Sequence, residues 1–217
     1  MNATILTLTT LFVVTIFAHH NPETSYRNAI KDLSIKYYHA EKEQFLASYS
    51  EKFEKQCPGL TEKFNQADKI FDECVDKISA NLTICETARR FLLKCTQPYV
   101  KIANDCLPED TKGLPDLLVK IVHSGNDYLC KQDGESLLEL VNPCVWANLD
   151  GPERKSCREK GTMILAKYLE KIPSTKEFCG DIKGLRGCSE TLVDKCGSPV
   201  TRRVHVGLYE ALVSPCS

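Results

Sequence analysis

The sequence has no long hydrophobic run beyond residue 18, because Lys, Glu or Asp interrupts its most apolar stretches every three or four positions. A membrane-spanning helix needs about 18 to 20 consecutive apolar residues, so we expect no membrane span in the mature chain. The chain also lacks an excess of one charge, with 28 Lys and Arg against 29 Asp and Glu. Since no segment concentrates basic residues, we do not expect a nucleic-acid partner.

Signatures of catalysis and of metal binding are missing as well. The chain contains no Gly-x-Ser-x-Gly, no His-Glu-x-x-His and no glycine-rich phosphate loop. Its closest cysteines, Cys188 and Cys196, are eight positions apart, whereas structural zinc sites use pairs of the Cys-x-x-Cys kind. We therefore predict a protein that is not an enzyme and that needs neither a cofactor nor a metal.

What the sequence does have is twelve cysteines. An even number of cysteines in a chain bound for an oxidising compartment is typical of a disulfide framework. We expect six disulfides, which would leave no thiol for nucleophilic catalysis, but the spacing does not determine which cysteines pair. The expected disulfide cysteines are Cys57, Cys74, Cys85, Cys95, Cys106, Cys130, Cys144, Cys157, Cys179, Cys188, Cys196 and Cys216.

Residues 1–18 have the pattern of a signal peptide. The apolar stretch from Ile5 to Ala18 has the length of a signal-peptide core, is too short to span a bilayer, and is followed by polar residues. We predict cleavage after Ala18 and secretion to the extracellular space. Residues 19–56 form a charged segment that we expect to be helical, and residues 57–217 form a cysteine-rich helical domain.

Apolar residues recur at intervals of three and four through the cysteine-rich region, and no alternating strand pattern appears. We predict an all-α fold, a disulfide-stapled bundle of about seven to eight helices. Thr83 with Glu86, and Ser174 with Glu177, have the spacing of capping boxes. The helices are expected near residues 60–82, 83–106, 114–129, 136–146, 152–172, 185–196 and 200–212, with a further short helix that runs through Phe178 and Cys179 after the Ser174 cap.

The apolar faces of these helices leave two alternatives open. They can form a solid core, which we favour, or they can enclose a pocket for a small hydrophobic molecule. The same side chains would serve either purpose: Phe64, Phe71, Phe91, Leu118, Ile121, Leu140, Tyr168 and Leu169.

Several motifs in this region resemble one known family. They are NDYLCKQDGE at 126–135 with Asn142-Pro143-Cys144, NDCLP at 104–108, and DKCGSP at 194–199. Together they resemble the insect 27 kDa haemolymph glycoprotein family over roughly Cys57 to Cys216, although this family has a Gly-Pro-Glu-Cys type of turn at Asn142-Pro143-Cys144. The resemblance implies a secreted, helical, cysteine-rich and often glycosylated protein whose family has no known activity.

Two further patterns bear on function. Asn81-Leu82-Thr83 is an N-glycosylation sequon between two predicted helices, and we predict that Asn81 carries a glycan. His123 and Asp127 are four residues apart, a spacing that places an imidazole and a carboxylate on one helix face. We interpret them as a surface pair, because the other residues of a hydrolytic site are missing.

Three functions remain open at this point. The first is an extracellular binding or carrier protein for a small hydrophobic ligand, which would use the apolar helix faces. The second is a circulating defence or protein-interaction factor, for which the charged segment from Tyr26 to Lys55 would bind an extracellular protein. The third, an unrecognised secreted hydrolase, is the least supported.

Overall fold

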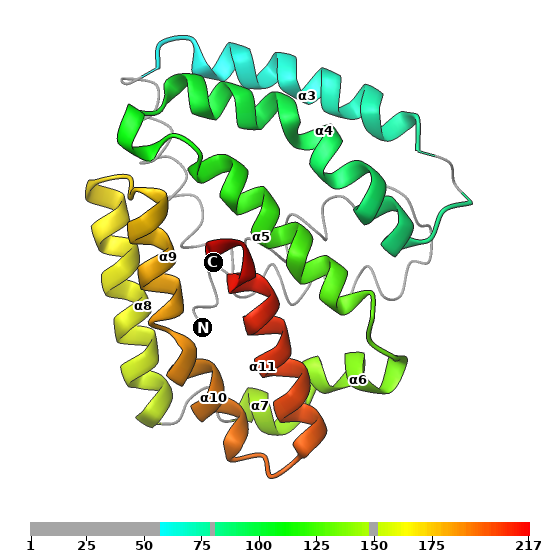
Figure 1. Ribbon diagram of the computed structural model, residues 1–217, viewed down its shortest axis with the longest axis vertical. Helices are drawn as coiled ribbons and strands as arrows, with labels where there is room; N and C mark the ends of the chain where they lie inside the picture. The colour runs from blue at the N-terminus through cyan, green and yellow to red at the C-terminus, as the bar shows by residue number, and fades with distance from the viewer. Residues whose placement is uncertain (1–56, 79–80, 148–151) are drawn as a thin grey trace.

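The computed structural model describes residues 57–78, 81–147 and 152–217 (Figure 1). The predicted signal peptide and the charged segment at 19–56 lie outside the described residues. Within the described ranges the fold is all-α, as predicted, with seven helices of nine or more residues and no strand. Helix α5 lies in the middle, with α3 and α4 on one side and α8 to α11 on the other (Figure 1).

Helices α3 (Leu60–Asp76) and α4 (Ile84–Cys106) lie side by side along one edge of the molecule (Figure 1). Helix α3 ends earlier than the predicted residue 82. Helix α4 starts at the predicted capping box, in which the backbone N–H of Glu86 donates to Thr83 Oγ1 at 3.2 Å and the Glu86 carboxylate accepts from the backbone N–H of Thr83 at 2.8 Å.

The central helix α5 spans Leu114–Leu129, the boundaries expected from the sequence. It starts after Gly113, whose φ of 85° lies in the left-handed region that favours glycine. One face of α5 packs against α4, and another packs against α11 (Pro199–Val213).

The prediction of a single helix over residues 136–146 is wrong. The structure has instead α6 (Gly134–Leu138), the 3₁₀ turn η2 (Glu139–Val141) and α7 (Pro143–Ala147). A proline disfavours the helical conformation of the residue before it, and Asn142 accordingly adopts ψ 123°. The apolar periodicity therefore continues across the break between α6 and α7.

The remaining helices are α8 (Pro152–Glu170), α9 (Thr175–Lys183) and α10 (Arg186–Asp194), and the chain ends in the 3₁₀ turn η4 (Ser214–Cys216). The Ser174 side chain caps α9 by accepting from the backbone N–H of Glu177 at 3.2 Å, which confirms this helix start. Helices α8 and α9 are joined by Asp181, whose carboxylate accepts from Tyr168 Oη at 2.7 Å and from Lys167 Nζ at 3.0 Å.

The main hydrophobic cluster lies where α5, α8, α9 and α11 meet. Its buried side chains are Leu114, Leu117, Ile121, Tyr168, Phe178, Ile182, Leu208 and Leu212. Ile121 and Tyr168 were expected there, but Leu118 is 42% exposed and does not belong to this core. Phe64 and Phe71 are half-buried and pack against the ring of Tyr99 between α3 and α4.

Candidate functional site

The twelve cysteines form six disulfides, and these fall into two separate sets. Three disulfides lie within residues 57–130, and they join Cys57 to Cys106, Cys74 to Cys95, and Cys85 to Cys130. The other three lie within residues 144–216, and they join Cys144 to Cys196, Cys157 to Cys188, and Cys179 to Cys216. No disulfide links the two sets, since no cysteine is left free. We call residues 57–130 and 144–216 the amino-terminal and carboxy-terminal halves.

The two halves meet mainly where α5 packs against α11 and the turn η4. A glycine on each helix allows the close approach. A Cβ atom at Gly125 of α5 would lie 2.7 Å from Leu212 Cδ2, and a Cβ atom at Gly207 of α11 would lie 2.7 Å from Tyr128 Cζ. The junction is therefore closely packed although no covalent bond crosses it.

A polar cluster joins the segment between the two halves to α11. Thr201 is fully buried, and its hydroxyl donates to the Glu139 carboxylate and accepts from Asn142 Nδ2 at 3.2 Å. Asn142 Nδ2 also donates to Glu139 at 2.7 Å, and His205 Nε2 lies 2.9 Å from the backbone oxygen of Glu139. The hydrogen bonds from Thr201 and Asn142 hold the pKa of the Glu139 carboxyl below its ordinary value.

The motifs that carry the family resemblance form disulfides and hydrogen bonds that hold the fold together. Asn142 belongs to one motif, and Cys144 of the same motif is bonded to Cys196 of another. In the upstream motif, Asn104 donates to Asp116 at 2.6 Å and accepts from the backbone N–H of Gly113 at 3.0 Å, which fixes the start of α5. These motif residues therefore hold the chain in place through a disulfide and two hydrogen bonds.

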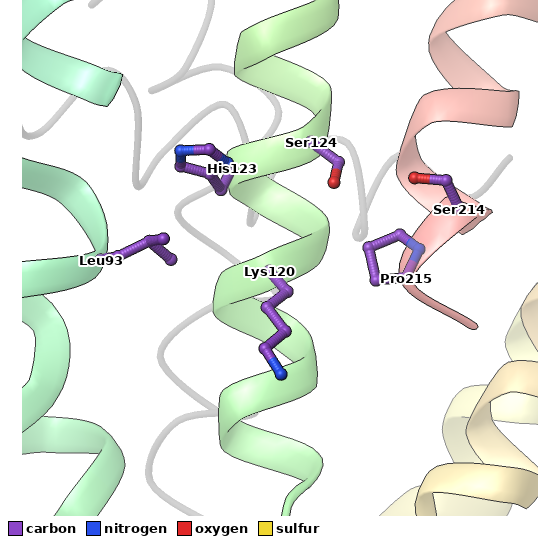
Figure 2. Close-up of a pocket in the computed structure, with 6 residues that line it drawn as sticks. All are labelled: Leu93, Lys120, His123, Ser124, Ser214 and Pro215. Atoms are coloured by element: carbon purple, nitrogen blue, oxygen red, sulfur yellow. The ribbon is translucent and has the colours of Figure 1, made fainter. Parts of the chain in front are cut away.

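A groove opens at the junction between the halves, over the face of α5 that lies between α4 and η4 (Figure 2). It has a volume of about 230 Å³ and is open to solvent. Its lining side chains come from three elements: Leu93 of α4, Lys120, His123 and Ser124 of α5, and Ser214 and Pro215 of η4. We take this groove as the candidate functional site, because pockets occur preferentially where two structural units meet.

Two carboxylates of α5, each about one helical turn from a groove residue, already have partners. Asp116, one turn before Lys120, accepts the hydrogen bond from Asn104. Asp127, one turn after His123, accepts from Lys131 at 2.6 Å and from Arg89 at 3.0 Å. Hydrogen bonds from Lys131 and Arg89 hold the pKa of the Asp127 carboxyl below its ordinary value.

The interpretation of His123 and Asp127 as a pair is therefore wrong. Asp127 bonds to Arg89 and Lys131, while the imidazole of His123 lies on the side of α5 that faces Leu93 (Figure 2). Among the described residues, no three His, Cys, Asp or Glu side chains are grouped as metal ligands.

Asn81, the predicted glycosylation site, lies in an exposed turn between α3 and α4. Thr83, the third residue of the sequon, also caps α4 through its hydroxyl. The position of Asn81 on the surface is compatible with a glycan, and occupancy remains a prediction.

Sequence reasoning identified one residue of the groove, His123, and missed the other five. Lys120, His123 and Ser124 have i, i+3, i+4 spacing on α5, which places them on one helix face and is the only local signal. Leu93, Ser214 and Pro215 come from distant parts of the sequence, so that only the packing of the two halves brings them to the groove.

Comparison with known proteins gives a family and no activity. A family model described as a protein of unknown function (DUF1397) matches residues 82–216, which is more than half of the chain. No curated protein and no solved structure matches the chain. Of the helices in the described residues, none is long and apolar enough to cross a membrane.

Proposed function

Because the chain belongs to this DUF1397 family of proteins of unknown function, we propose its role from its own residues: a secreted, non-enzymatic glycoprotein that binds or carries a small hydrophobic ligand. The groove between the two disulfide-linked halves carries this proposal. It has apolar side chains on both walls, Leu93 on α4 and Pro215 on η4.

The proposed extracellular location is supported by the disulfides. Six disulfides persist in oxidising compartments such as the extracellular space. The motif resemblance further supports a protein of the insect haemolymph type. Sequencing the amino terminus of the released protein tests this point, since removal of residues 1–18 would leave His19 first, and an intact Met1 would contradict it.

The hydrogen bonds in the groove support binding without catalysis. A serine nucleophile is normally activated by a hydrogen bond to a base that a third group orients. Ser214 Oγ instead donates to the backbone oxygen of Ala211 at 2.8 Å, and the carboxylate of Asp127, one turn after His123, is bound by Arg89 and Lys131. The groove therefore offers contacts for holding a ligand.

Native purification followed by solvent extraction and mass spectrometry tests the proposal. We expect a small molecule with an apolar part in the wild-type protein, and its loss in Ser124→Phe, which fills the groove. Ser156→Phe, at an exposed position of α8 outside the groove, is the control and should retain the molecule. If the extracts of wild type and Ser124→Phe have the same content, the proposed binding site is wrong.

One observation favours a second candidate, a protein-interaction factor. Three apolar side chains near one another in sequence are exposed in the α6 and η2 region: Leu137 is 38% exposed, Leu138 64% and Val141 59%. Clustered exposed apolar residues often mark binding surfaces. Leu138→Ser should then weaken binding of an extracellular partner, whereas Met163→Ser, at a position that is also 64% exposed, should not. Equal effects of the two substitutions would exclude this surface.

A further inference from the structure

The charged residue of the groove indicates which class of ligand it binds. We infer that the groove binds a small amphipathic carboxylate, with its carboxylate at Lys120 and its short apolar chain against Leu93 and Pro215. This inference rests on the proposed binding function and adds to it the chemical nature of the ligand.

The first argument is electrostatic. Among the described residues that line the groove none is Asp or Glu, and Lys120 makes no ion pair with any residue that the structure describes. Asp116, which has the i, i+4 spacing for an ion pair with Lys120, is bound by Asn104 instead. The ammonium group at the groove is thus left for a negatively charged ligand.

The second argument is the set of hydrogen-bond donors. Lys120, His123 and Ser124 all line the groove, and each can donate a hydrogen bond to an oxygen; His123 is turned toward Leu93, on the other side of α5 from Ser124 (Figure 2). Figure 2 shows Ser124 on the side of α5 that faces Ser214 and Pro215, with Lys120 one turn below it. A carboxylate has two oxygens that accept hydrogen bonds, so a carboxylate bound at Lys120 has a second oxygen for another donor.

The third argument concerns the apolar part and its size. Leu93 is 36% exposed although it is a large apolar side chain, and it faces the groove opposite Pro215 (Figure 2). Typical sites that enclose a drug-sized molecule measure roughly 300 to 1,000 Å³. A groove of about 230 Å³ is smaller, so it fits a short apolar chain and leaves a long acyl chain without cover.

The position of the groove has a consequence for stability. Lys120 and His123 belong to the amino-terminal half, whereas Ser214 and Pro215 belong to the carboxy-terminal half. A ligand that contacts both halves binds only when they are docked. It therefore stabilises their junction, because a ligand that binds the folded state alone raises the unfolding free energy.

The inference is tested by titrating the disulfide-intact, full-length secreted protein with three probes. Binding is monitored through the amide chemical shifts in NMR spectra. Hexanoate has both the carboxylate and the chain, hexan-1-ol has only the chain, and acetate has only the carboxylate. We expect hexanoate to bind saturably and to shift amides of α5 and η4. It should bind about fivefold more tightly than hexan-1-ol, in line with an exposed ion pair of about 1 kcal/mol, and also more tightly than acetate, which lacks the apolar chain.

Two lysine variants give the matched comparison. Lys120→Met should weaken hexanoate binding about fivefold, while Lys120→Arg, which keeps the charge, should not. Lys101→Met changes the net charge equally at an exposed position of α4 outside the groove and should bind as wild type does.

Three results would overturn the inference: no saturable hexanoate binding, equally tight binding of hexan-1-ol, or unchanged affinity in Lys120→Met. In each case a neutral apolar molecule found in the native protein, and lost in Ser124→Phe, would still support the proposed function. Failure of the carboxylate inference can therefore be distinguished from failure of the proposed binding function.

Discussion

Tyr128 of α5 lies against Gly207 of α11, and its hydroxyl donates to the backbone oxygen of Arg203 at 3.3 Å. The phenol fills the space that a side chain at position 207 would need, and it does so at the junction between two halves that no disulfide connects. Burial at this contact raises the pKa of the Tyr128 hydroxyl above its ordinary value.

Gly207→Ala should therefore destabilise the protein. The added Cβ would lie 2.7 Å from Tyr128 Cζ, and overpacking of this kind costs about 1 to 3 kcal/mol. Gly187→Ala in α10 is the control, because a Cβ there has no neighbour within 4 Å, and replacing an exposed helical glycine by alanine stabilises by about 0.5 to 1 kcal/mol. Urea denaturation compares the two, and equal shifts in one direction would contradict the close contact.

The two sets of disulfides predict a specific peptide map. Digestion without reduction should yield disulfide-linked peptides within residues 57–130 and within 144–216, and none that joins the two ranges. Thiol counting on the denatured, unreduced protein should find no free cysteine. A linked pair that joins the ranges, or two or more free thiols per chain, would refute this connectivity.

Loss of one disulfide should reduce stability without separating the halves. Replacing both Cys144 and Cys196 by alanine removes the link between α7 and the end of α10, and the loss of a disulfide typically costs about 2 to 4 kcal/mol. The free energy of unfolding in urea measures this cost. Because the junction of α5 and α11 does not depend on this disulfide, the sedimentation coefficient of the folded variant should equal that of wild type.

Thr201→Val tests the buried polar cluster. Valine has nearly the same shape, but it leaves the carboxylate of Glu139 and the amide of Asn142 without the Thr201 hydroxyl. Loss of a buried hydrogen-bond partner costs about 1 to 3 kcal/mol. Thr191→Val, at an exposed position of α10 whose hydroxyl bonds only to Gly187, should change the unfolding free energy by less than about 0.5 kcal/mol.

The same cluster predicts that the stabilising effect of Thr201 depends on pH. The pKa of Glu139 is lowered in the folded state, first by Thr201 and then by Asn142, so its stabilising effect is present above the unfolded pKa and is lost as the pH falls through the folded pKa. The stability difference between wild type and Thr201→Val should therefore shrink on acidification below about pH 4, near the ordinary pKa of a Glu carboxyl. If the difference in unfolding free energy stays constant from neutral to acid pH, it does not come from the ionised Glu139 carboxylate.

Substitutions at the sequon separate its two roles. Asn81→Gln should remove the mass that an amide-cleaving glycosidase releases and leave the cap of α4 intact. Thr83→Ala should remove the glycan and also destabilise by about 1 kcal/mol through the lost cap, whereas Thr83→Ser keeps both functions. If untreated wild type and Asn81→Gln differ only by the mass of the substitution, Asn81 carries no glycan.

Features that depend only on neighbouring residues could be predicted from the sequence. The boundaries of α5 at Leu114 and Leu129, the cap at Thr83 and the helical fold class all follow from local periodicity and backbone hydrogen bonds. The expectation of six disulfides followed from an even cysteine count. These signals are contained within a few turns of chain.

Tertiary packing decided the rest. Periodicity identified the apolar residues of α5 but not its partners, so it did not show that Leu118 stays exposed while Gly125 receives Leu212. The cysteine count could not show that no disulfide joins the halves. The groove exists only because Leu93, Lys120 and Pro215, from three distant segments, are brought together when α4, α5 and η4 pack, and contacts between residues far apart in sequence leave no local pattern to read.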